Sequence, residues 1–147
     1  MNVTIGVIAI SLDLKQIVML ERLEFGVSLA SISMVYDWIY QTLQTITSPV
    51  FNEFVIRLLD VGNPWARMNR DGWAAVDALL NSTAEGNPDF RVVFKGNFSS
   101  FRDSTLSNPN GIRSFITSFM PLVSSSRWVK FEYVSHAESN RGRFGVP

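Results

Sequence analysis

Residues 90–95 read Phe-Arg-Val-Val-Phe-Lys, a short run in which Phe90, Val92 and Phe94 stand at every second position. Side chains alternate across a strand, so these three aromatic and aliphatic residues share one face. The opposite face carries two basic residues around Val93. The run therefore predicts a strand that buries one face and leaves the other partly polar.

A helix is predicted immediately before this strand. Asp71 is a suitable cap, and the segment ends at Gly86-Asn87-Pro88, where a glycine followed by a proline is typical of a helix C-terminus. Between these signals the apolar residues recur at intervals of three and four, which places them on one helical face. This predicted buried stripe consists of Trp73, Val76, Leu79 and Leu80.

The same alternation of helix and strand extends in both directions along the chain. Further strands are predicted at residues 23–27 (LEFGV), 54–59 (FVIRLL) and 129–134 (VKFEYV). A helix is predicted over residues 32–46, which ends at Ser48-Pro49. Another is predicted to begin at Asn108-Pro109 as N-cap and first helical residue and to stop at Pro121.

Strands that are separated by helices indicate an α/β fold with a parallel sheet, because a parallel neighbour is reached through a crossover connection. Two architectures fit. One is a short parallel-sheet solenoid of leucine-rich-repeat-like β-α units with all helices on one face; the other is a doubly wound α/β domain with helices on both faces. Alternation in three of the four strands favours the solenoid, whereas the nearly continuous apolar run at 54–59 favours the alternative.

Composition and length predict one globular domain. The 147 residues are 46% hydrophobic and 18% charged, an ordinary balance for a folded protein. We expect an α/β repeat domain over residues 1–134, in which the apolar segment 3–10 forms an edge strand or a loose arm. Residues 135–147 are polar and contain glycine, which predicts a flexible C-terminal tail.

The sequence contains few of the residues and motifs that commonly form catalytic sites. It has no cysteine, a single histidine (His136), and none of the glycine-rich motifs that bind phosphates or dinucleotides. We therefore expect a non-enzymatic protein with no catalytic residues, metal site or cofactor. Its 13 basic and 13 acidic residues cancel, so neither nucleic acid nor a membrane is an expected partner. Without a convincing signal peptide, an intracellular location, cytoplasmic or nuclear, is expected.

A candidate protein-binding face follows from the strand alternation. If the apolar strand residues point toward the helices, the charged residues between them line the other side of the sheet. Two interpretations stay open for this face: it binds a protein partner, or its charges only pair with one another across neighbouring strands. The candidate residues are Glu24, Arg57, Arg91, Lys95, Lys130 and Glu132.

The doubly wound alternative predicts a different site. In an open α/β sheet, ligands bind beyond the carboxyl ends of the strands, where Asp60 and Lys95 would stand. A small-ligand site there competes with simpler roles, since Asp60 begins a glycine- and proline-containing turn and Lys95 ends a strand. Trp65, in the same loop as Asp60, is the tryptophan without a place in a predicted apolar stripe.

Several segments resemble a known family: LERLEFGVSLASISMVYDWIYQTLQTITSPVFNEFVI, DGWAAVDALL, NPDFRVVFKGNFSSFRD and MPLVSSSRWVKFEYV. They are similar to the C-terminal repeat region of the F-box and leucine-rich-repeat-like proteins of mushroom-forming fungi. The resemblance spans roughly residues 14–134 and implies a solenoid that recognises the substrates of a ubiquitin ligase.

In that family an F-box docks on the Skp1 adaptor of a cullin ubiquitin ligase. No F-box precedes the repeats in this sequence, so direct Skp1 binding is not expected. The alternatives are an isolated recognition domain that binds an unknown protein through its sheet, and a truncated product that retains no activity.

Overall fold

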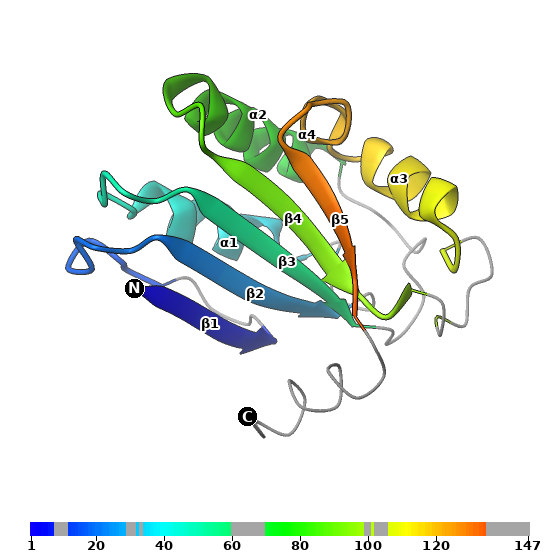
Figure 1. Cartoon of the computed structure of the whole chain (residues 1–147), viewed down its shortest axis with the longest axis horizontal. Helices are drawn as coiled ribbons and strands as arrows, with labels where there is room; N and C mark the ends of the chain where they lie inside the picture. The colour runs from blue at the N-terminus through cyan, green and yellow to red at the C-terminus, as the bar shows by residue number, and fades with distance from the viewer. Residues whose placement is uncertain are drawn as a thin grey trace.

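The computed structural model describes residues 1–7, 12–28, 32, 34–59, 70–98, 101 and 106–134. Strands and helices alternate along most of this chain (Figure 1). In order they are β1 (Asn2–Val7), β2 (Arg22–Ser28), α1 (Tyr36–Gln44), β3 (Glu53–Leu59), α2 (Arg70–Gly86), β4 (Arg91–Gly96), α3 (Pro109–Thr117), α4 (Pro121–Ser124) and β5 (Val129–Tyr133).

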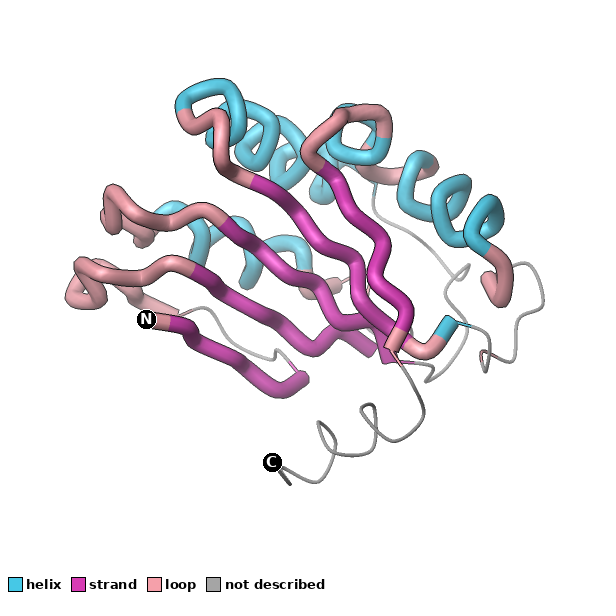
Figure 2. The backbone as a smooth tube through the Cα atoms, in the orientation of Figure 1, coloured by secondary structure: helices cyan, strands magenta, loops and turns pink. Residues whose placement is uncertain are grey.

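The strands form one five-stranded sheet in the order β1-β2-β3-β4-β5, and every neighbouring pair is parallel. Each strand therefore lies beside the strand that precedes it in the sequence. A right-handed crossover between such neighbours always returns on the same side of the sheet. In agreement with this rule, the helices form a single layer on one side of the strands (Figures 1 and 2). The α/β class and the parallel pairing predicted from the sequence are confirmed.

The hydrophobic core lies between this helical layer and the sheet. Residues of alternate strand positions join helix residues in one buried cluster, so each strand packs one face against the helices. From the strands the cluster includes Leu23, Phe25, Phe54, Ile56, Val92 and Phe94, and from the helices it includes Ile39, Trp73, Val76, Leu80 and Phe115. The predicted stripe of α2 is buried here except for Leu79, which is half-buried.

The strand order does not fit the doubly wound alternative. A doubly wound sheet reverses its order at a switch point, and ligands bind at that reversal. No reversal occurs among the five described strands.

Several element boundaries differ from the sequence predictions. Residues Asn2–Val7 form β1 at the edge of the sheet, whereas residues 8–10 of the predicted segment lie outside the described part. Helix α1 is shorter than predicted and begins at Tyr36. α3 ends at Thr117, before Pro121 as predicted, and Pro121 then begins the short helix α4, a position that proline tolerates because its missing N–H would be unpaired there anyway. The predicted cap is confirmed: the Asn108 side chain accepts a hydrogen bond from Gly111 N–H at 2.8 Å.

Gly72 permits a close approach between α1 and α2. A Cβ atom at this position would lie 2.3 Å from the ring of Tyr36, well inside van der Waals contact. We expect Gly72→Ala to lower the free energy of unfolding by about 1–3 kcal/mol, because the ring or the helix must shift. Urea denaturation followed by circular dichroism measures this change.

Gly86, in the same helix, is the matched control. No heavy atom lies within 4 Å of a Cβ built there, and the residue has no left-handed backbone conformation. Gly86→Ala should therefore leave stability unchanged or raise it by up to about 1 kcal/mol through the better helix propensity of alanine. Equal losses for the two variants would contradict the steric role of Gly72.

Candidate functional site

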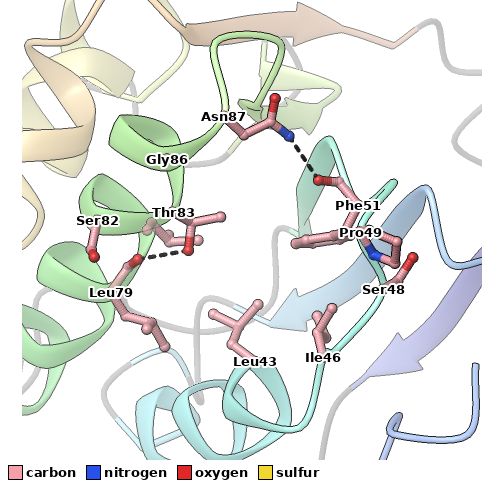
Figure 3. Close-up of a pocket in the computed structure, with 11 residues that line it drawn as sticks. Leu43, Ile46, Ser48, Pro49, Phe51, Leu79, Ser82, Thr83, Gly86 and Asn87 are labelled. Carbon is pink, nitrogen blue, oxygen red and sulfur yellow. Dashed lines mark hydrogen bonds between the residues drawn. The ribbon is translucent and has the colours of Figure 1, made fainter. Parts of the chain in front are cut away.

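A cavity of about 270 Å³ lies on the helical side of the molecule, between the C-terminal ends of α1 and α2 (Figure 3). Leu43 and Ile46 line it from one side and Leu79 and Thr83 from the other, with Phe51 at the turn before β3. Its walls combine apolar and polar side chains in about equal measure. This cavity separates two successive helices of the layer.

Three of the polar side chains that line this cavity are already hydrogen-bonded within the fold. The Thr83 hydroxyl donates to the carbonyl of Leu79 at 2.9 Å, and the Asn87 amide donates to the carbonyl of Phe51 at 3.1 Å (Figure 3). The Ser48 hydroxyl donates to the carbonyl of Leu20 at 2.7 Å. No ionisable side chain is among the described residues that line the cavity. It therefore lacks the groups that would perform acid–base chemistry.

The side of the sheet opposite the helices carries a patterned set of charges. We call this surface the charged face, and strand register arranges it in rows across the sheet. The first row joins Arg22, Glu53 and Arg91; the second joins Glu24, Val55, Val93 and Lys130; the third joins Gly26, Arg57, Lys95 and Glu132. All six residues predicted from the sequence belong to these rows, together with Arg22 and Glu53.

The first row is held by one carboxylate between two guanidinium groups. Glu53 accepts from Arg22 Nε through Oε2 at 3.0 Å and from Arg91 Nε through Oε1 at 2.8 Å. These bonds link β2, β3 and β4 on the same level of the sheet. Charge-assisted hydrogen bonds of this kind are stronger than neutral ones, so the row is a fixed part of the surface.

The second row is nearly closed to solvent at its centre. Glu24 has a side-chain exposure of only 6%, and Val55 and Val93 are 1% and 2% exposed. Glu24 Oε1 accepts from Arg22 at 2.7 Å and lies 3.7 Å from Lys95 Nζ. Because β3 separates β2 from β4, the Glu24–Lys95 pair must pass over the middle strand. The positive charges of Arg22 and Lys95 offset the free-energy cost of burying the Glu24 carboxylate.

Three of the predicted residues make no ion pair with any described residue: Arg57, Lys130 and Glu132. Lys130 and Glu132 are exposed on the edge strand β5. Arg57 stands between Gly26 and Lys95, and its Nε atom is buried without a hydrogen-bond partner in the described structure. Glu24, Arg91 and Lys95 therefore pair within the sheet, Lys130 and Glu132 are exposed, and Arg57 is partly buried without an ion pair to a described residue.

Sequence reasoning missed Arg22 and Glu53. The signal was present, because each residue directly precedes the apolar start of a strand and continues its alternation by one position. β2 and β3 each begin one residue earlier than predicted, and this extension adds Arg22 and Glu53 to Arg91 in the first row.

The other sequence hypotheses concern residues that the structure places only in part. Lys95 belongs to the charged face, whereas Asp60 and Trp65 lie outside the described residues, as does His136. Among the residues that are described, no three acidic or histidine side chains gather closely enough to hold a metal ion. Within the same ranges, none of the helices has the length and apolar character needed to cross a membrane.

Comparison with known protein families, with curated proteins and with solved structures found no match to this chain.

Proposed function

We propose that this chain is a non-enzymatic interaction domain, a short leucine-rich-repeat-like solenoid that binds a protein partner through the charged face. The observation that supports it best is the one-sided sheet. Parallel sheets are normally covered on both faces, and solenoids are the class in which one face stays available for a partner. No described helix lies on the charged face, and the part of it toward β5 is exposed at Arg91, Lys130 and Glu132.

A repeated turn before the strands supports the solenoid interpretation. The N–H of Phe51 donates to the carbonyl of Ser48, and the N–H of Phe90 donates in the same way to Asn87. In both turns the polar side chain reaches back to the preceding unit: Ser48 donates to Leu20, and Asn87 donates to Phe51. One hydrogen-bonding pattern therefore joins three successive units.

An apolar row accompanies these hydrogen bonds. The ring centroids of Phe51 and Phe90 lie 5.7 Å apart, and those of Phe90 and Trp128 lie 6.1 Å apart. Aromatic pairs at such distances add to the burial of their apolar surface. Equivalent residues of neighbouring units thus pack on each other, as they do in repeat proteins, where each unit covers the apolar face of the next.

The resemblance to the F-box and leucine-rich-repeat-like family supplies the biological setting of this proposal. In that setting the charged face would recognise a protein destined for ubiquitination. A protein partner suits the face because its charges are of both signs and include arginine, which is enriched at protein interfaces.

A charge exchange within the third row tests the proposal. Arg57→Glu combined with Glu132→Lys keeps the net charge but inverts the pattern at two residues that make no described ion pair. We expect the double variant to fold like the wild type. Its affinity for the protein partner should fall about tenfold or more, because each exchanged residue would then face a partner group of the same charge. Affinity purification with quantitative mass spectrometry identifies the partner, and calorimetry measures its binding.

The matched control exchanges two charges on the exposed side of α2. Arg70→Glu with Glu85→Lys has the same net charge as the wild type, and each new charge suits its end of the helix dipole. Partners that bind both double variants as well as the wild type would contradict a function of the charged face. Arg91→Glu is unsuitable as a first test, because it would place two carboxylates together at Glu53.

A further inference from the structure

A second cavity, of about 500 Å³, opens where β4 and β5 begin. Phe90 and Trp128 contribute aromatic walls, and their rings pack at a centroid distance of 6.1 Å. Arg91 and Lys130 reach its rim from the charged face, and Arg127 from the turn before β5. We call this hollow the edge cleft. It lies beside the charged face and is built by residues of two neighbouring units.

The edge cleft is positively charged although the whole chain has no net charge. Three basic residues and one acidic residue, Asp89, line it, so its formal charge is +2. Arg91 is engaged with Glu53, but Arg127 and Lys130 are exposed and pair with no described acidic group. Two cations next to an aromatic wall are therefore available to a ligand of opposite charge.

The neighbouring strand offers a second type of contact. β5 is the last strand of the described sheet and pairs only with β4, so its outer edge presents backbone N–H and C=O groups without a strand partner. An extended peptide can pair with such an edge through its own backbone, while alternate side chains reach nearby pockets.

We propose that the edge cleft binds an acidic, extended segment of the protein partner, whose carboxylates contact Arg127 and Lys130. This inference rests on the proposed function and specifies the chemistry of the partner. A nucleic acid fits less well, since Asp89 and Glu132 flank the two cations and would repel a continuous row of phosphates. Individual carboxylates on a peptide can avoid these acidic groups.

The direct test uses the wild-type protein and two synthetic peptides with blocked ends. One alternates glutamate and valine, and the other alternates glutamine and valine. In nuclear magnetic resonance titrations we expect the glutamate peptide to shift the backbone amide signals of residues 89–91 and 127–133. The glutamine peptide should bind about tenfold more weakly at low salt, because it lacks the charges that pair with the exposed cations.

Two double variants locate the binding. Arg127→Glu with Lys130→Glu should weaken the glutamate peptide about tenfold or more, whereas Lys15→Glu with Arg70→Glu, an equal change of charge elsewhere, should not. Equal binding of the two peptides, shifts confined to other residues, or tighter binding of single-stranded DNA than of the glutamate peptide would each overturn the inference. If the exchange at Arg57 and Glu132 still abolishes partner binding, the proposed function survives that failure.

Discussion

Trp73→Ala is expected to lower the free energy of unfolding by about 3–5 kcal/mol, the largest effect of any single change considered for this protein. The side chain has no exposed surface. Its ring lies 5.1 Å from that of Phe119, and its indole N–H donates to the carbonyl of Ile32 at 2.7 Å. Alanine would leave a cavity between α2 and the following helices and an unpaired buried carbonyl.

Two further variants separate the parts of this effect. Trp73→Phe keeps an aromatic ring but removes the donor to Ile32, so we expect a smaller loss of about 1–3 kcal/mol. Trp38→Ala removes a tryptophan that is only half-buried, and it should also cost less than Trp73→Ala. Urea denaturation followed by circular dichroism suits all three, because tryptophan fluorescence changes with the substitutions themselves. A loss for Trp38→Ala that equals or exceeds that of Trp73→Ala would contradict this description of the core.

The elements of the core were the part of the fold that sequence could predict. The alternation of Phe90, Val92 and Phe94 and the helical spacing of Trp73 and Val76 are local patterns, and local patterns determine which face of an element is apolar. The Asn108 cap was predictable for the same reason, since its partner Gly111 lies three residues away. Once strands alternate with helices, the parallel sheet follows from the need for crossovers.

Features that depend on distant partners were not predictable. Helix α4 has four residues, too few to form without tertiary support, and its first N–H groups are bound by Asp77, which is 46 residues away from Val123 in sequence. Asp77 lies on the apolar stripe of α2 and interrupts it with a buried carboxylate. Periodicity alone gives no reason to bury that residue.

The candidate site likewise has one property that the sequence predicts, the face on which its residues lie, and one that it does not, the pairing among them. Alternation placed all six predicted residues on one face, as the structure also does. Which of them pair depends on strand register and side-chain reach: Lys95 meets Glu24 from two strands away. The distinction between the paired residues and those without an ion pair to a described residue, which are Arg57, Lys130 and Glu132, therefore required the three-dimensional structure.

Asp77→Ala should lower the free energy of unfolding by about 2–4 kcal/mol at neutral pH. The Asp77 carboxylate is 2% exposed and accepts from Val123 N–H at 2.8 Å and from Leu122 N–H at 3.0 Å. It thereby caps α4 from a neighbouring helix and holds α2 and α4 together. Alanine would leave a buried backbone donor without a partner, and α4 should lose its protection in amide hydrogen exchange.

Asp89→Ala is the matched control, because Asp89 is exposed and its carboxylate bonds no described group. This change should alter stability by less than about 0.5 kcal/mol. Equal losses for the two aspartate variants, or unchanged exchange protection of Leu122 and Val123 in Asp77→Ala, would contradict the capping role.

Titration of Asp77 gives the capping contact a characteristic dependence on pH. Burial raises the pKa of Asp77 above its ordinary value of 3.8, and the N–H groups of Val123 and Leu122 oppose that rise only in part. The folded protein therefore holds this proton more tightly than the unfolded chain does. The resulting stabilisation is complete below the unfolded pKa and is lost as pH rises through the raised folded pKa.

Asp77→Asn isolates this contribution, since the amide keeps one acceptor for Val123 but does not titrate. We expect the stability of the wild type relative to Asp77→Asn to fall as pH rises from below 3.8 through the raised pKa, and then to stay constant toward neutral pH. Urea denaturation of both proteins across this range measures the difference. A relative stability that instead rises with pH would mean that the hydrogen bonds to Leu122 and Val123 outweigh burial, and that the ionised carboxylate is the form the fold favours.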